Sequence, residues 1–192
     1  MDPEIRLLVP DDWAAFRRVR LAALTDAPQF FGTTPAEAHS RTESDWRHAL
    51  SDRAQFLACS SGTEVGTVAG MIDSERGVVH LISMWVAPGA RGTGVSDRLV
   101  RAVLDWAVAG GHRVVRLEFA EHNSFAERLY LRNGFARTGV SGPIAPSDPR
   151  QEFEMEWRPP EPGLPTHPPG IRASTASETS VPHRDAEDRR QR

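Results

Sequence analysis

Lysine is absent from this chain of 192 residues, so all 23 of its basic residues are arginine. We interpret that bias as the codon usage of a genome rich in G and C. Cysteine occurs once, at Cys59, which excludes an intramolecular disulfide. Because Cys59 lies in the apolar run QFLACS, we expect a buried, unreactive thiol rather than a nucleophile.

Long hydrophobic runs are also missing. No apolar stretch approaches the roughly 18 residues that a membrane-spanning helix needs. The first residues, MDPEIRLLVPDD, lack the basic start and the apolar core of a secretory signal. These absences predict a cytoplasmic protein that does not bind a membrane.

A strong charge of one sign is lacking as well. The formal net charge is -3 and the isoelectric point is about 6.2. Proteins that bind nucleic acid through its phosphates carry a marked basic excess. The sequence therefore gives no electrostatic reason to expect nucleic acid as a partner.

Aromatic residues are absent from the last segment, residues 159–192, which holds seven of the 15 prolines. Such a segment buries too little apolar surface to offset its loss of conformational entropy. We therefore expect one folded domain at 1–158 and a disordered tail at 159–192.

The folded part alternates strands and helices. Short apolar runs bounded by turns predict strands at 4–9, 55–60, 64–73, 77–86 and 113–120, followed by FARTG (135–139) and EFEMEW (152–157). Helical spacing and caps predict helices at 11–24, 42–50, 94–109 and 123–133, with Asp11 capping the first and Thr42 with Asp45 opening the second. Residues 25–40 are expected to be a loop. The order βααβββαβαββ predicts an α/β (α+β) fold with a central mixed sheet of about seven strands and four helices.

The stretch WVAPGARGTGVSDRL at 85–99 places arginine and glycine where a strand gives way to a helix. A helix N-terminus carries unsatisfied N–H groups and a partial positive charge, which suit an anion. Glycine allows backbone conformations in which successive N–H groups surround a phosphate. A turn that simply needs glycine is the structural alternative. The chain lacks G-x-x-x-x-G-K-[ST], so a P-loop is excluded, and the dinucleotide pattern G-x-G-x-x-G is absent too.

About 30 residues later comes NSFAERLYLRNGF at 123–135, and the two segments together resemble the GCN5-related N-acetyltransferase (GNAT) superfamily. The first matches its acetyl-CoA signature at Arg91, Gly92, Thr93, Gly94, Val95 and Ser96. The second matches N-x-x-A-x-x-L-Y-x-x-x-G-F at Asn123, Ala126, Leu129, Tyr130, Gly134 and Phe135. The resemblance covers residues 4–158 and implies the GNAT acyl-CoA N-acyltransferase fold, with a mostly antiparallel twisted sheet.

The resemblance departs from the family pattern at two positions. Ser96 stands where the family has glycine or alanine, and Asp97 follows it. A carboxylate suits the helix dipole but opposes a bound anion, so we expect Asp97 to be harmless only if it points away from the loop.

The resemblance implies direct transfer of the acetyl group of acetyl-CoA to an amine, with no metal. It gives Tyr130 the role of proton donor to the leaving thiolate and places the main chain of Met84, Trp85 and Val86 beside the pantetheine and the developing oxyanion. It also sets the Asn123 side chain toward the pantetheine, where Asn123 can in addition cap its helix.

The general base stays open at this stage. Glu118 matches the glutamate that ribosomal-protein alanine acetyltransferases carry on this strand, whereas it can equally be an exposed strand residue. His80, whose ordinary pKa suits a base, is the second candidate, and a water relay is the third. Phe30, Phe31 and Glu37 are expected to line the acceptor pocket.

Three functions compete on these residues. The first is an N-acetyltransferase whose acceptor is a primary amine of a small molecule or a peptide N-terminus, in a monomer or a homodimer. The second is a non-catalytic CoA-binding regulatory module. The third keeps the fold and takes a longer acyl donor.

Overall fold

The computed structural model describes residues 3–144 and 150–160 and contains one sheet of seven strands in the order β1-β2-β3-β4-β5-β7-β6. Neighbouring strands are antiparallel except β4 and β5, which are parallel. The strands are β1 (Glu4–Leu7), β2 (Ala54–Ser60), β3 (Thr63–Asp73), β4 (Val78–Val86), β5 (Val115–Ala120), β6 (Ala136–Pro143) and β7 (Gln151–Trp157).

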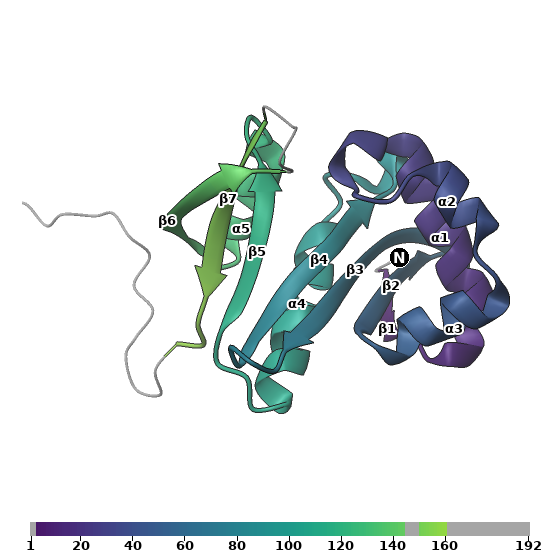
Figure 1. Cartoon of the computed structure of the whole chain (residues 1–192), viewed down its shortest axis with the longest axis horizontal. Helices are drawn as coiled ribbons and strands as arrows, with labels where there is room; N and C mark the ends of the chain where they lie inside the picture. Colours follow the sequence, from purple (N-terminus) through teal and green to yellow (C-terminus); the bar gives the residue numbers. More distant parts are fainter. Residues whose placement is uncertain (1–2, 145–149, 161–192) are drawn as a thin grey trace, which may run out of the picture. The chain divides into compact units, whose positions relative to one another are not determined.

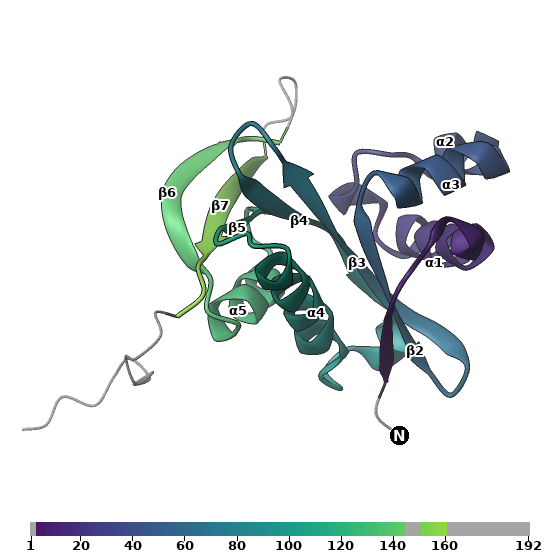
Figure 2. The ribbon, with the colours of Figure 1, turned by 90° about the horizontal axis from the view of Figure 1, so that it is seen from below.

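Five α-helices cover the two faces of this sheet. They are α1 (Trp13–Asp26), α2 (Pro35–Ser40), α3 (Glu43–Ser51), α4 (Val95–Ala109) and α5 (Ser124–Arg132). Helices α4 and α5 lie on one face, and α1, α2 and α3 lie on the other (Figures 1 and 2). The predicted α/β class, the mostly antiparallel sheet and all seven strands are therefore confirmed.

The prediction of four helices is wrong by one, because the expected loop at 25–40 contains α2. Thr34 Oγ1 accepts a hydrogen bond from Glu37 N, and the Glu37 carboxylate accepts one from Thr34 N. This reciprocal pair satisfies two N–H groups at the start of α2 and stabilises a helix too short to show a periodic pattern.

The predicted cap at Asp11 is also wrong. A short 3-10 turn (Pro10–Asp12) precedes α1, and the neighbouring Asp12 carboxylate accepts from Val9 N at 3.0 Å. Asp11 instead pairs with Arg47 of α3. The predicted capping pair of Thr42 and Asp45 at the start of α3 is confirmed.

A hydrophobic core lies on each face of the sheet. On the α4 face, Leu99, Val100, Val103 and Leu104 are buried against strand residues such as Val68. On the α1 face, Trp46 is fully buried and stands edge-on to Phe16, with ring centroids 5.3 Å apart. Cys59 borders this second core and is half-buried rather than buried, and desolvation raises the pKa of its thiol.

Strands β4 and β5 pair only at their beginnings. Val79 lies opposite Val115 and His80 opposite Arg116, and no further pair follows although β4 continues to Val86 and β5 to Ala120. The two strands diverge from that point (Figure 1). On the side that faces β5, the later part of β4 therefore has main-chain groups with no strand beside them.

Within residues 3–144 and 150–160, no helix has the length and apolar character required to cross a membrane. The predicted tail at 159–192 lies outside the described residues except for its first two.

We predict that Leu99→Ala lowers the free energy of unfolding by about 2–5 kcal/mol, because it removes a fully buried side chain that holds α4 on the sheet. Urea denaturation monitored by tryptophan fluorescence measures the change. Leu131→Ala is the matched control, since Leu131 is 50% exposed and its truncation creates no cavity. Equal losses in the two variants would contradict this assignment of the core.

Candidate active site

The end of β4 is distorted by a bulge. Its register against β3 shifts between Thr67 and Ala69, and Ser83 takes a φ of +57°, which a residue with a Cβ rarely adopts. Ala87 N donates to Val65 O, so the Gly66–Val86 pair is a non-hydrogen-bonded one. By strand alternation, the N–H and C=O groups of Met84 and Val86 point away from β3 toward the split, whereas those of Trp85 point to β3.

Two of the three glycines in the loop before α4 have left-handed backbone conformations. Gly92 has a φ of +79° and Gly94 a φ of +87°. A Cβ at either position would meet no atom within 4 Å, so conformation rather than space requires glycine there. Gly94 is the N-cap of α4 and provides no side-chain cap, which leaves the first N–H groups of the helix directed outward.

Arg91 joins this loop to the end of α1. Its guanidinium forms an ion pair with Asp26, and its Nε donates to Val86 O at 3.0 Å. The same Asp26 carboxylate accepts from Trp85 Nε1 at 2.9 Å. Asp26 therefore fixes both the loop and the strand that precedes it.

Asp97 faces α5. Its carboxylate pairs with Arg132 at 2.6 Å and accepts from Asn133 Nδ2 at 2.8 Å. The hydrogen bond from Arg132 lowers the pKa of Asp97. The negative charge of Asp97 is thus matched by the Arg132 cation on α5. From the sequence we expected Asp97 to be harmless only if it pointed away from the loop, and this pairing meets that expectation. The Ser96 hydroxyl lies 3.5 Å from an Arg132 nitrogen.

Tyr130 is buried on α5, and its ring stands edge-on to Phe135 at 5.7 Å. Desolvation raises the pKa of its phenol above the ordinary range, so the hydroxyl keeps its proton at neutral pH. Within the described part of the chain, two fully buried side-chain polar atoms have no hydrogen-bond partner, namely Trp46 Nε1 and Gln55 Oε1. The Tyr130 hydroxyl oxygen is not one of these buried, unpaired atoms.

Asn123 caps α5, because its Oδ1 accepts from Ala126 N at 3.1 Å. The predicted cap is therefore confirmed. The bond uses the side-chain oxygen and leaves the two N–H donors of the amide for another partner. Ala126, one turn into the helix, packs against the core beside Tyr130.

The structure brings the two candidate bases together where β4 and β5 begin to diverge. His80 Nδ1 lies 3.9 Å from the Glu118 carboxylate, and His80 Nε2 lies 4.0 Å from that of Asp73. His80 is 19% exposed and Glu118 36%. Both separations exceed a hydrogen bond, and a water beside the two partners could contact both.

The three predicted acceptor residues have different surroundings. Phe31 packs against the α1 core and carries the guanidinium of Arg20 over its ring at 4.5 Å. Phe30 is 51% exposed. The Glu37 carboxylate is engaged in the cap of α2, and its hydrogen bonds to Thr34 lower its pKa. Glu37 therefore has a structural role that explains its position.

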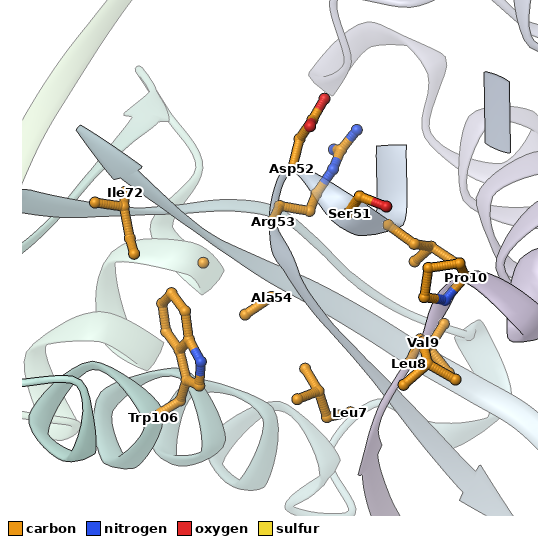
Figure 3. Close-up of a pocket in the computed structure, with 12 residues that line it drawn as sticks. Leu7, Leu8, Val9, Pro10, Ser51, Asp52, Arg53, Ala54, Ile72 and Trp106 are labelled. Carbon is orange, nitrogen blue, oxygen red and sulfur yellow. The ribbon is translucent and has the colours of Figure 1, made fainter. Parts of the chain in front are cut away.

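A groove of about 340 Å³ lies elsewhere. Apolar residues such as Leu7, Ala54, Ile72 and Trp106 line most of it, and Ser51, Asp52 and Arg53 complete one side (Figure 3). Ile72 pairs with Val79 near the start of β4, whereas the glycine loop follows Val86 at its end. This groove is therefore not the site that the sequence predicts.

Sequence reasoning missed two residues of the site. Asp26 ends a helix that its sequence marks only as amphipathic, and its partners are 59 and 65 positions away. Ser83 occupies a left-handed conformation that glycine or asparagine would have signalled and serine does not.

Comparisons with known proteins agree with the resemblance found in the sequence. The model of the acetyltransferase (GNAT) family matches residues 19–135. The chain is 38% identical over 98 residues to an IAA acetyltransferase of Azospirillum brasilense, covering 51% of this chain and 63% of that protein. It is 30% identical over 172 residues to a mycothiol acetyltransferase of Cellulomonas flavigena, covering 85% of this chain and 45% of the relative. The chain thus spans roughly half the length of these relatives.

The fold is also that of solved acetyl-CoA complexes. The structure of yncA from Salmonella typhimurium with its cofactor acetyl-CoA superimposes with a TM-score of 0.65. The match covers 86% of this chain and 99% of yncA at 20% identity. At that identity the likeness establishes the fold alone.

We predict that Asp97→Asn lowers the free energy of unfolding at pH 7 by up to about 1 kcal/mol, because the pair with Arg132 is partly exposed. The folded-state pKa of Asp97 is depressed, so its stabilisation is present above the unfolded value of about 4 and is lost as pH falls through the folded pKa. Urea denaturation at pH 7 and pH 3 should show the gap between wild type and variant narrowing. Asp105→Asn on the same helix is the control, and a gap that does not change with pH would refute the assignment.

Proposed function

This chain belongs to the acetyltransferase (GNAT) family, and on that premise we propose that it transfers the acetyl group of acetyl-CoA directly to a primary amine. The observation that carries the proposal is the split between β4 and β5, with outward main-chain groups on one side and the glycine loop at its end. Acetyl-CoA is the co-substrate, and both substrates are bound before transfer.

The residues for CoA fall into two groups. The main chain from Gly92 to Ser96 holds the pyrophosphate at the N-terminus of α4, where two left-handed glycines turn successive N–H groups toward it. Arg91 supplies a guanidinium that Asp26 already orients.

The pantetheine arm pairs with β4 as an added strand. Met84 and Val86 offer the outward N–H and C=O groups, and Val86 O is shared with Arg91 Nε. Asn123 lies at the start of α5 with its amide N–H groups available to the arm. Trp85, whose main chain faces β3, contributes by holding Asp26 instead.

The reaction needs three proton or charge adjustments. The neutral amine attacks the thioester carbonyl, a C–N bond forms and the C–S bond breaks. The oxygen that becomes negative accepts a hydrogen bond from Met84 N–H on the split side of β4. The Tyr130 hydroxyl gives its proton to the leaving thiolate, and burial keeps that proton available at neutral pH.

The amine loses its proton toward His80 and Glu118. Their 3.9 Å separation places a base and a carboxylate on the same face of the sheet, so a water between them can carry the proton outward. We propose that the two act together, and that Phe30 and Phe31 form part of the acceptor wall. The acetyltransferase domain is residues 1–158, and 159–192 is a separate tail.

We predict that the protein binds acetyl-CoA and that Gly94→Ala weakens this binding at least tenfold, because alanine opposes the φ of +87°. Isothermal titration calorimetry with acetyl-CoA and desulfo-CoA measures the affinity. Gly89→Ala is the control, since Gly89 lies in the same loop without a positive φ and with open space at its Cβ. Equal affinities of the two variants would remove the loop from the site.

We predict that Tyr130→Phe lowers kcat for amine-dependent thiol release by about 10²–10⁴-fold and leaves acetyl-CoA affinity within threefold, since a lost general acid affects the step and not the binding. Free thiol is measured spectrophotometrically against a panel of amines. Phe135→Leu, which alters the ring packed against Tyr130, controls for disturbed packing. Binding of CoA with no turnover of any amine would instead support the non-catalytic CoA-binding module.

A further inference from the structure

Three arginines gather on the α1 face of the sheet. Arg20 lies on α1, Arg41 lies between α2 and α3, and Arg53 lies between α3 and β2. Each carries its guanidinium over an aromatic ring, which is Phe31 for Arg20, Trp46 for Arg41 and Phe16 for Arg53. We name them the arginine cluster.

The cluster has no matching carboxylate among residues 3–144 and 150–160. Two other arginines of these helices are paired, since Arg18 contacts Glu64 and Arg47 contacts Asp11 and Glu43. No described carboxylate lies within ion-pairing distance of Arg20, Arg41 or Arg53. The cluster therefore lacks the direct ion pairs that Arg18 and Arg47 make nearby.

The nearest acids are engaged elsewhere. Glu37 and Asp45 sense the charge of Arg41, but their carboxylates close the caps of α2 and α3. Asp52, beside Arg53 in sequence, contacts His48 at 3.3 Å. These carboxylates act on Arg41 and Arg53 from a distance, but none of them forms an ion pair with the cluster.

The three guanidinium groups are partly desolvated and repel one another. Burial first, then the charges of Arg53 and Arg41, together lower the pKa of Arg20 to about 10. Burial and Arg41 lower the pKa of Arg53, and Asp52 opposes them only in part. A bound anion would offset both the desolvation and the mutual repulsion.

The known contacts of these arginines leave donors unused. Arg53 Nε donates to Ala49 O, and Arg20 Nη1 lies 3.4 Å from Ser83 Oγ. Each guanidinium has five N–H donors in a planar fork that matches a carboxylate. In Figure 3 the Arg53 guanidinium points away from Trp106 and Leu7, which belong to the apolar groove.

The cluster reaches the reacting centre through Ser83. Ser83 directly precedes Met84, and consecutive Cα atoms lie about 3.8 Å apart. His80 is on the same strand, and Glu118 lies beyond it on β5. The α1 face of the sheet thus carries cations on one side of β4 and an acid on the other.

We propose that the arginine cluster binds a carboxylate of the acceptor, so that the acceptor is an amino acid rather than a simple amine. This inference rests on the proposed function and names its substrate class. The carboxylate faces Arg20 and its two neighbours, and the amine lies toward His80 and Glu118. Ile82 lies between His80 and Ser83 in the sequence of β4.

The test compares acceptors that differ only in the carboxylate. The panel holds the L-amino acids, their amides and the amines formed by decarboxylation, such as L-methionine, L-methioninamide and 3-(methylthio)propylamine. Thiol release from acetyl-CoA is measured for each at equal concentration of free amine. We expect at least a tenfold higher kcat/KM for an amino acid than for both of its neutral counterparts.

Substitution assigns that preference to the cluster. Arg20→Met keeps the contact with Phe31 and removes the charge, and we expect it to raise KM for the amino acid at least tenfold while kcat/KM for the decarboxylated amine changes less than threefold. Arg20→Lys should restore part of the preference. Arg18→Met, which breaks an exposed pair on the same helix, is the matched control, and Arg41→Met is a second variant outside the helix should Arg20→Met fail to fold.

The outcomes separate the two proposals. Decarboxylated amines or amides used as well as the amino acids would overturn the arginine cluster as a carboxylate site and leave the acetyltransferase intact. An equal loss for all acceptors in Arg20→Met would also overturn it, since that loss reflects structure. CoA binding without thiol release from any acceptor would overturn the proposed function and this inference with it.

Discussion

The early end of the pairing between β4 and β5 is the constraint on which the rest of the site depends. Two parallel strands that remained paired to their ends would satisfy each other's main-chain groups and leave no place for an extended ligand. Here pairing stops after His80 and Arg116, and the bulge at Ser83 increases the local twist of β4. The split, the outward groups of Met84 and Val86, and the position of the glycine loop all follow from that divergence.

The charged residues around the split are held in ion pairs, and they do not form an excess of one sign. Asp26 holds Arg91, and Arg132 holds Asp97, so the loop at the start of α4 is fixed at both sides by ion pairs. A surface pair contributes little to stability by itself. Here each pair fixes a position. The pair of Asp26 and Arg91 links α1 to the glycine loop, and the pair of Arg132 and Asp97 links α5 to the start of α4.

Much of the fold could be predicted from the sequence, because most helices and strands have a recognisable local sequence pattern. The apolar runs and turns predicted every strand, and the pair Thr42 and Asp45 predicted the start of α3. The glycine loop was predictable for a related reason, since a left-handed conformation restricts which residue can occupy it. Helix α2 was not predictable from periodicity, because six residues show no repeat.

The parts that could not be predicted depend on distant partners. Asp26 has no distinguishing neighbour in sequence, and its function arises only where α1 ends beside Trp85 and Arg91. The same holds for the arginine cluster, whose members belong to three separate segments. An arginine in a sequence does not reveal whether a carboxylate will lie beside it, and only the fold distinguishes Arg18, which has one, from Arg20, which does not.

In the proposed function, the two faces of the sheet divide the work of the site. The α4 and α5 face supplies groups fixed by backbone geometry, namely the left-handed glycines, the cap of Asn123 and the buried Tyr130. The α1 face carries side-chain charge on α1 and on the segments that flank α3. A fold arranged in this way can hold one co-substrate constant and alter the second by changing a few side chains. The chemistry of the acceptor is therefore to be sought in the α1 face, and the unpaired arginines are its most distinctive feature.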